Sequence, residues 1–248
     1  MKFAVFAKSV LAMTCSVTMV CSSLGLSASA NSNEDVRQGL PGRRISGGVR
    51  SECFKDSNQS LVAMTPRDLL SKTAQAHPTF WFSLPDTQNP KHISFELFDA
   101  SDTAIYSTQM EKVSASGLSK VEIPETAPAL NKGENYRWVF SINCENTPDA
   151  SALEVQGWVR RVEISAEASE QIASAGLQDR VELYEAAGLW HEQVTMLAER
   201  HLAEPASPEA QQAWAALVQS TGLDDYIAES PSETAIDITN GDMSTALF

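Results

Sequence analysis

Thr79-Phe80-Trp81-Phe82-Ser83-Leu84 is the stretch that decides the fold, and it lies between Pro78 and Pro85. Aromatic residues favour strands, and the two prolines confine the strand to this stretch. Working outward, similar short runs lie on both sides, with turn residues between them: 61–64, 93–98, 104–110, 121–123, 136–142 and 155–164. About seven short strands without intervening helices are typical of an antiparallel sandwich. We therefore expect a β-sandwich domain over residues 53–165.

A corner before the strand at 136–142 indicates the kind of sandwich. Leu130 lies six residues before Tyr136, across the polar turn NKGEN at 131–135. In immunoglobulin-like and fibronectin-like sandwiches, a tyrosine at such a corner packs its ring inward and bonds its hydroxyl back to the corner backbone. The sequence therefore predicts an immunoglobulin-like sandwich in which Leu130 and Tyr136 have structural roles.

Apolar residues recur at helical spacing from residue 166 on, with Gly176, Gly188 and Gly222 as stops and Ser207-Pro208 as a start. Part of this pattern looks like one degenerate tetratricopeptide repeat, carried by Tyr184, Gly188, Trp190, Leu197 and Pro205. One repeat cannot bury its own apolar face, so we expect residues 166–228 to pack on the sandwich or on a neighbouring molecule. The predicted fold class is α+β: an antiparallel immunoglobulin-like β-sandwich followed by a short tetratricopeptide-like helical segment.

The first thirty residues have the pattern of a signal peptide. Lys2 and Lys8 precede or flank an apolar run at 9–21, and Ala28-Ser29-Ala30 is a small-x-small cleavage site. The run would span about 20 Å as a helix, which is short of a bilayer core of roughly 30 Å. We therefore expect cleavage after residue 30, export to the periplasm or the cell exterior, and no membrane span afterwards; an uncleaved anchor is the alternative.

Composition predicts little order at the two ends of the processed chain. Residues 31–52 are rich in glycine, serine and arginine without apolar periodicity, and 229–248 are polar and aperiodic. Such segments bury too little apolar surface to order themselves, so we expect a disordered leader and a disordered tail. The leader carries four arginines, which predict either a solvated linker or a contact with a partner or wall polymer: Arg37, Arg43, Arg44 and Arg50.

Net charge argues against nucleic acid as a partner. The full chain has 18 basic and 32 acidic residues, and loss of 1–30 leaves 16 basic against 32 acidic, a net charge of −16. A chain with this balance repels phosphate backbones and anionic headgroups.

Two cysteines, Cys53 and Cys144, lie beyond the signal peptide. In an exported chain two cysteines are more often paired than free. Their disulfide would close a loop of about ninety residues, which the chain-entropy treatment values at about 4–5 kcal/mol. A reactive thiol is the alternative, although no histidine lies near either cysteine in sequence.

Sequence motifs of catalysis are missing: the chain has no phosphate-binding glycine loop, no Cys-x-x-Cys, no His-Glu-x-x-His and no Gly-x-Ser-x-Gly. We expect no catalytic residue, no cofactor and no metal site. The four histidines are scattered, and each is expected to be a surface or packing residue: His77, His92, His191 and His201.

Five residues within the predicted strands have other possible roles. Trp81, Trp138 and Trp158 are either core residues or, if they share an exposed face, a platform for stacking on sugar rings. Arg160 and Arg161 alternate in one strand, so one of them approaches the core or marks the strand end. That arginine would need an acidic partner, and the ion pair could join the sandwich to the helices.

Several segments resemble the DUF928 family, a family of cyanobacterial exported proteins with a domain of unknown function. The resemblance rests on LVAM at 61–64, HPTFWF at 77–82, YRWVF at 136–140, Cys144, GWVRRV at 157–162, LY at 183–184 and AGLW at 187–190. It implies export and implies that both cysteines belong to the family pattern. It implies no reaction or cofactor.

These observations lead to one leading hypothesis of function and two alternatives. The leading hypothesis is a non-enzymatic interaction or scaffold module of the cell envelope, which contacts another exported protein. A polysaccharide-binding module that uses exposed tryptophans is the first alternative. A hydrolase whose site is assembled from scattered residues is the second.

Overall fold

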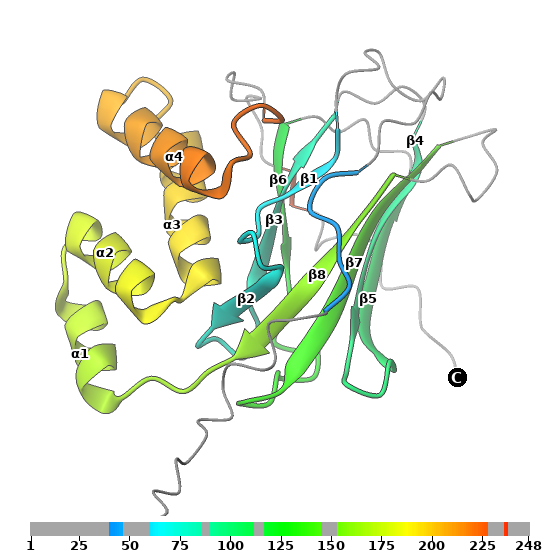
Figure 1. Ribbon diagram of the computed structural model, residues 1–248, viewed down its shortest axis with the longest axis horizontal. Coiled ribbons are helices and arrows are strands. Elements are labelled where there is room, and N and C mark those ends of the chain that lie inside the picture. The colour runs from blue at the N-terminus through cyan, green and yellow to red at the C-terminus, as the bar shows by residue number, and fades with distance from the viewer. Residues whose placement is uncertain are drawn as a thin grey trace, which may run out of the picture. The chain divides into compact units, whose positions relative to one another are not determined.

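The computed structural model describes residues 40–46, 60–85, 90–111, 117–144, 153–227 and 236–237. Two β-sheets and four helices make up this part of the chain (Figure 1), so the fold class is α+β. The larger sheet has the order β2 (Leu70–Thr73), β8 (Leu153–Arg161), β7 (Asn135–Cys144), β4 (Pro90–Phe98) and β5 (Ala104–Glu111). The smaller sheet has the order β1 (Val62–Ala63), β3 (Thr79–Leu84), β6 (Gly117–Glu122) and β9 (Ile236–Asp237).

The pairing of the strands corrects the expectation of an antiparallel sandwich. Most neighbours are antiparallel, but β2 runs parallel to β8 and β9 runs parallel to β6. The chain crosses from β1 in the smaller sheet to β2 in the larger one, then returns to the smaller sheet at β3. Because of this crossing, β2 joins the larger sheet as an edge strand rather than as half of a hairpin.

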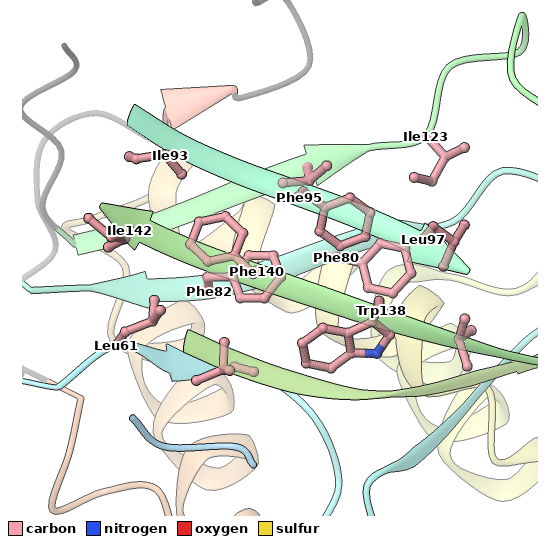
Figure 2. Packing of buried hydrophobic residues seen from close by; sticks show 14 of the residues in the cluster. Leu61, Phe80, Phe82, Ile93, Phe95, Leu97, Ile123, Trp138, Phe140 and Ile142 are labelled. Atoms are coloured by element: carbon pink, nitrogen blue, oxygen red, sulfur yellow. The ribbon is translucent and has the colours of Figure 1, made fainter. Parts of the chain in front are cut away.

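The space between the sheets holds an almost wholly apolar core (Figure 2). Alternate residues of β3, β4 and β7 point into it, and the Phe82 and Phe140 rings stack with their centroids 4.0 Å apart. Trp138 reaches its neighbour strand at Gly157, where an added Cβ would lie 2.5 Å from the indole ring. Only glycine leaves room for the tryptophan at this close approach.

Both faces of β3 are covered. Phe80 and Phe82 face the larger sheet, whereas Trp81 belongs to a second core shared with the helices. That second core includes Val194, Leu197 and other apolar residues from the last two helices. The helical segment therefore packs on the sandwich, which was one of the two arrangements expected.

The helices begin and end where the sequence predicts. They are α1 (Ala166–Ser174), α2 (Leu177–Ala187), α3 (Trp190–Ala203) and α4 (Pro208–Thr221). Ser207 caps the start of α4, and its hydroxyl accepts a bond from the Ala210 amide. Gly188 and Gly222 end α2 and α4 with φ of 67° and 66°, the left-handed conformation that glycine adopts without strain. No helix within the described ranges is long and apolar enough to cross a bilayer.

The predicted leader is partly wrong. Residues 40–46 are described, and Arg43 exchanges two backbone hydrogen bonds with Gln156 of β8. Arg44 donates to the carbonyls of Thr65 and Thr221, which ties this segment to the end of α4. Backbone bonds supplied by the sandwich order a segment that could not order itself.

In the predicted tail, Ile236–Asp237 forms β9, which corrects the expectation of disorder for these two residues. The signal peptide at 1–30 and Cys53 lie outside the described residues, and Cys144 is the last residue of β7. The disulfide therefore stays a prediction.

Candidate functional site

The three tryptophans do not form an exposed platform. Trp81 and Trp138 are only 3% and 2% exposed, and the Trp81 indole donates to the Thr195 hydroxyl at 3.1 Å. Trp158 is half-buried, and its indole donates to the Pro41 carbonyl at 2.9 Å. A sugar-stacking site needs accessible ring faces, and burial removes two of the three rings from the surface. The suggestion that these three residues bind sugar together is therefore wrong.

The two arginines of β8 also differ from expectation. Arg161 ends the strand and donates to the backbone carbonyls of Leu130 and Ala74, at 2.8 and 3.2 Å. Arg160 donates to the Asn135 side-chain carbonyl at 2.6 Å. Neither has a carboxylate within ion-pair distance in the described part of the chain. Within the described ranges the expected acidic partner is therefore missing, and the backbone carbonyls of Leu130 and Ala74 satisfy the guanidinium of Arg161 instead.

The corner at Leu130 and Tyr136 has the local geometry expected for it. Leu130 is fully buried in the core between the sheets, and Tyr136 is almost so. The Tyr136 hydroxyl accepts a bond from the Asn131 amide at 2.9 Å and donates to Glu134 Oε2 at 3.1 Å. Burial raises the pKa of this phenol, so the hydroxyl keeps the proton that it donates.

A buried polar cluster lies where the first turn of α3 meets both sheets. His191 lies between Ser71 of β2 and Thr79 of β3, with Nε2 2.7 Å from the Ser71 hydroxyl and Nδ1 2.8 Å from the Thr79 carbonyl. The next residue, Glu192, accepts bonds at Oε1 from the Thr73 hydroxyl at 2.9 Å and the Ala74 amide at 2.8 Å. Because β2 and β3 belong to different sheets, His191 bridges the two sheets from one helix.

The Thr79 carbonyl fixes a proton on Nδ1 of His191, because a carbonyl can only accept. The Ser71 hydroxyl has a single proton, for which Nε2 of the neutral ring and the Trp158 carbonyl compete as acceptors. Burial lowers the pKa of His191 from 6.5 to about 4 and keeps the ring neutral near pH 7. The edge of the ring also packs on Phe80, at 4.8 Å between centroids.

Glu192 holds its carboxyl group in a costly environment. Burial raises its pKa, although the bonds from Ala74 and Thr73 oppose that rise. Oε2 is buried and has no hydrogen-bond partner among the described residues, whereas Oε1 has two. A buried carboxyl group with one oxygen unpartnered costs stability. The bonds that Oε1 accepts from Thr73 and Ala74 are what hold the end of β2 in place.

The Ser71–His191 pair has the atoms of a nucleophile and a base but not the setting. Ser71 is 1% exposed, and its hydroxyl also lies 2.9 Å from the Trp158 carbonyl. Nδ1 of His191 faces a carbonyl where a hydrolytic triad places a carboxylate. A buried hydroxyl in this position cannot meet a substrate, so the arrangement joins the helices to the sheets.

Sequence reasoning missed this cluster. It identified the stripe of Trp190, Val194, Leu197 and His201, which repeats at helical spacing. His191, Glu192 and Gln193 are buried as well, because the start of α3 is covered from more than one side. Polar residues on several faces of one helical turn give no periodic signal. His191 and His201 are both packing histidines, and the His201 ring stacks on Trp214.

The helix pair α1–α2, with residues 163–187, is the part of the helical segment that packs least. α1 buries none of its side chains, α2 buries only Val181, and Leu177 is 46% exposed. Its only basic residue is Arg180, which donates to the Ala175 carbonyl. We call this pair the acidic helix pair after its six exposed carboxylates: Glu163, Glu167, Glu170, Asp179, Glu182 and Glu185.

Charge is divided unevenly along the chain. Residues 31–162 carry 14 basic and 16 acidic residues, a net of −2. Residues 163–228 carry 2 basic and 12 acidic residues, a net of −10. No cluster of three or more metal-ligating side chains is present among the described residues, so these carboxylates are spread rather than gathered.

Comparison with known families decides the relationship. The family model of DUF928, a domain of unknown function, matches residues 45–232, which include both sheets up to β8 and all four helices. The chain belongs to the DUF928 family. A search for related curated proteins finds no match.

Solved structures similar to this DUF928 chain include bacterial β-glucuronidases. The Parabacteroides merdae enzyme, solved with glycerol in its active site, is 12% identical, with a TM-score of 0.25 over 46% of this chain and 13% of that chain. The apo Bacteroides uniformis β-glucuronidase 3 is 12% identical, with a TM-score of 0.23 over 40% of this chain and 11% of that chain.

Proposed function

We propose that this DUF928 protein is a non-enzymatic interaction or scaffold module of the cell envelope, and that it binds a cationic protein partner through the acidic helix pair. The observation that carries the proposal is the packing of α1 and α2, which together bury one side chain and expose five of the six carboxylates. Leu177 supplies an exposed apolar anchor among these charges. A partner with basic side chains around an apolar pocket matches this surface.

The finer fold assignment belongs to the same proposal. We take the sandwich to be immunoglobulin-like, supported by the bond between Tyr136 and the Asn131 amide. We take α2 and α3 to be tetratricopeptide-like, supported by the tight turn at Gly188 between them. Repeats of that kind present helices to other proteins, which agrees with a binding role.

Export is a further part of the proposal, and it rests on the signal-peptide pattern at 1–30. An exported chain would begin at Asn31 and would join Cys53 to Cys144. Intact-mass analysis under non-reducing conditions should show the processed chain with two hydrogens fewer than the dithiol. An unprocessed precursor in the cytosol with two free thiols would contradict both statements.

Site-specific photocrosslinking tests the binding role. A photoreactive residue at position 177 should give an adduct with one basic exported protein, and raising the salt concentration should weaken it because exposed charges are screened. The same residue at Glu125, an exposed loop position, is the matched control and should give no adduct. Equal labelling at both positions would contradict the proposal.

The two alternative functions predict different results. A polysaccharide-binding module would retain wall glycans on an array, and a hydrolase would turn over model esters or glycosides. The buried Trp81 and Trp138 and the enclosed Ser71 give neither alternative support. Glycan retention or turnover by the purified protein would replace the proposed function.

A further inference from the structure

Residues 40–46, which we call the strap, join the two sheets at one edge of the sandwich (blue in Figure 1). Arg43 exchanges two backbone hydrogen bonds of 2.9 Å with Gln156 of β8, and Ile45 pairs with Val62 of β1. Both pairings are antiparallel. Because β8 belongs to the larger sheet and β1 to the smaller one, the strap takes the position of a strand between them.

No other strand in the described part of the chain fills this position. β2 pairs with residues 158–161 of β8, so the preceding half of β8, at 153–157, has only the strap beside it on that side. β1 has two residues and pairs with β3 on its other side. Departure of the strap would therefore uncover backbone donors and acceptors on both sheets, which is the kind of edge that accepts an extended peptide.

Hydrogen bonds rather than apolar burial hold the strap. Ser46 is its only buried residue, and the other six are half-buried or exposed. The Ser46 hydroxyl accepts a bond from the Leu61 amide at 2.9 Å, and the Arg44 carbonyl accepts one from the Ala63 amide at 2.8 Å. Segments with few buried apolar contacts open at a lower free energy than the core. We therefore expect the strap to open while the sandwich stays folded.

The strap also shows which side chains fit the slot between β8 and β1. At Gly42 an added Cβ would lie 2.9 Å from Leu69 Cδ1 and 3.0 Å from the Gln156 carbonyl oxygen, so a side chain there would push the segment away from β8. Arg44 donates to the carbonyl of Thr221, the last residue of α4, at 3.1 Å. The C-terminal end of a helix favours a cation. The slot thus suits an extended chain in which a basic residue follows two positions after a glycine.

We propose that the strap is an internal ligand of this slot, and that an extended basic segment of a partner protein displaces it. The partner's glycine would lie at the position of Gly42 and its basic side chain at that of Arg44. Charge selects this occupant, because a processed chain with a net charge of −16 attracts a basic segment and repels an acidic one. The inference rests on the proposed function only for the class of partner. Photocrosslinking at position 177 does not involve the slot, so failure there would contradict the role of the helix pair and leave the slot untouched.

Binding of a synthetic peptide tests the slot. The peptide GLPGRRISG has the sequence of residues 39–47, and fluorescence anisotropy follows its binding to the full-length protein. G42V/R44Q weakens the fit and removes the anchor of its own strap, so it should bind the peptide. The wild type should bind it about a hundredfold more weakly, because its own strap occupies the slot most of the time. R43Q removes the same charge from an exposed position and keeps the backbone bonds, so it should bind as weakly as the wild type.

Two altered peptides separate fit from charge. The G42V peptide keeps both arginines but carries a side chain where the slot has no room, and the R44E peptide keeps the glycine but reverses the charge at the end of α4. Neither should bind the G42V/R44Q protein. Equal binding of the G42V peptide and the unaltered peptide would reduce the effect to general attraction between a basic peptide and an acidic protein, and would overturn the proposal. A folded G42V/R44Q that binds no peptide would overturn it as well.

Hydrogen exchange of the unchanged protein covers the case in which G42V/R44Q does not fold. The Arg43 amide should exchange about a hundredfold faster than the amides of β4 and β7, because the strap opens without global unfolding. With the peptide in excess the Arg43 amide should exchange faster still, whereas the Gln156 amide should not, because the peptide accepts its bond in place of Arg43. Exchange of the Arg43 amide at the rate of the core amides, with and without the peptide, would overturn the proposal.

Discussion

The two buried interfaces of this protein are built from different chemistry. Between the sheets, aromatic and aliphatic side chains from β3, β4 and β7 make an apolar core, in which Trp138 Nε1 has no hydrogen-bond partner from the described part of the chain. Between the two sheets and the helices, apolar packing on β3 is joined by His191 and Glu192, which bond to β2 of the larger sheet and β3 of the smaller one. The first interface gains free energy from area removed from water, and the second fixes position through directional bonds. The difference teaches that the sandwich supplies stability while the helical layer is set in register by two side chains.

The largest expected effect is in the apolar core. Phe82→Ala should lower the free energy of unfolding by about 3–5 kcal/mol, because it removes a fully buried ring and leaves a cavity beside Phe140. Urea unfolding at pH 7 measures the loss. Phe98→Ala is the control, since Phe98 lies half-buried under Arg137. Equal losses for the two variants would contradict the assignment of the core.

At the polar interface, the effect of His191 depends on pH. The unfolded chain takes up a proton near pH 6.5, but the folded chain does so only near pH 4, where the buried His191 titrates. The contribution of the neutral His191 ring to the free energy of unfolding is therefore present above pH 6.5 and is lost as the pH falls to about 4. His191→Gln should be less stable than the wild type at pH 7, and the difference should shrink by about 3 kcal/mol across that window. A difference independent of pH would contradict the buried neutral ring.

Two substitutions of Glu192 test the hydrogen bonds of the same interface. Glu192→Ala should cost about 1–3 kcal/mol, because the Ala74 amide and Thr73 hydroxyl lose their acceptor. Glu192→Gln keeps an acceptor and removes the charge. Burial raises the pKa of Glu192 in the folded protein, so protonated Glu192 favours the folded state below about pH 4.5. This stabilisation is lost as the pH rises from there through the raised pKa. Thermal melts should show the melting temperature of Glu192→Gln rising relative to that of the wild type as the pH rises. The opposite trend would exclude a buried carboxylate.

The smallest predicted effect is at the corner of the sandwich. Tyr136→Phe should lower stability by about 0.5–1.5 kcal/mol, because the Asn131 amide loses the hydroxyl that accepts its bond. The pH dependence should not change between pH 4 and 7, unlike that of the His191 and Glu192 variants. An unchanged denaturation midpoint for this variant would show that the corner bond contributes nothing.

The two interfaces also differ in how far the sequence predicts them. Alternation in 93–98 and the aromatic and β-branched run at 136–142 identified two strands of the apolar core, and glycine and proline placed the helix ends correctly. The sequence could not show which way Trp81 points, because both faces of β3 are covered. The alternation of side chains along a strand does not tell which face packs on the larger sheet and which on the helices. β2 was missed because Leu70-Ser71-Lys72-Thr73 has one apolar residue. It is a strand only because β8 and the α3 side chains supply its bonds, and such long-range partners leave no local pattern.

The pH titration of the His191 imidazole by NMR tests most directly whether a buried polar contact sets the helical layer on the sandwich. We expect the ring to stay in the neutral form with its proton on Nδ1 from pH 7 down past pH 5, and to titrate near pH 4. A titration near pH 6.5, with both ring nitrogens exchanging with solvent, would show that α3 does not insert this side chain between β2 and β3.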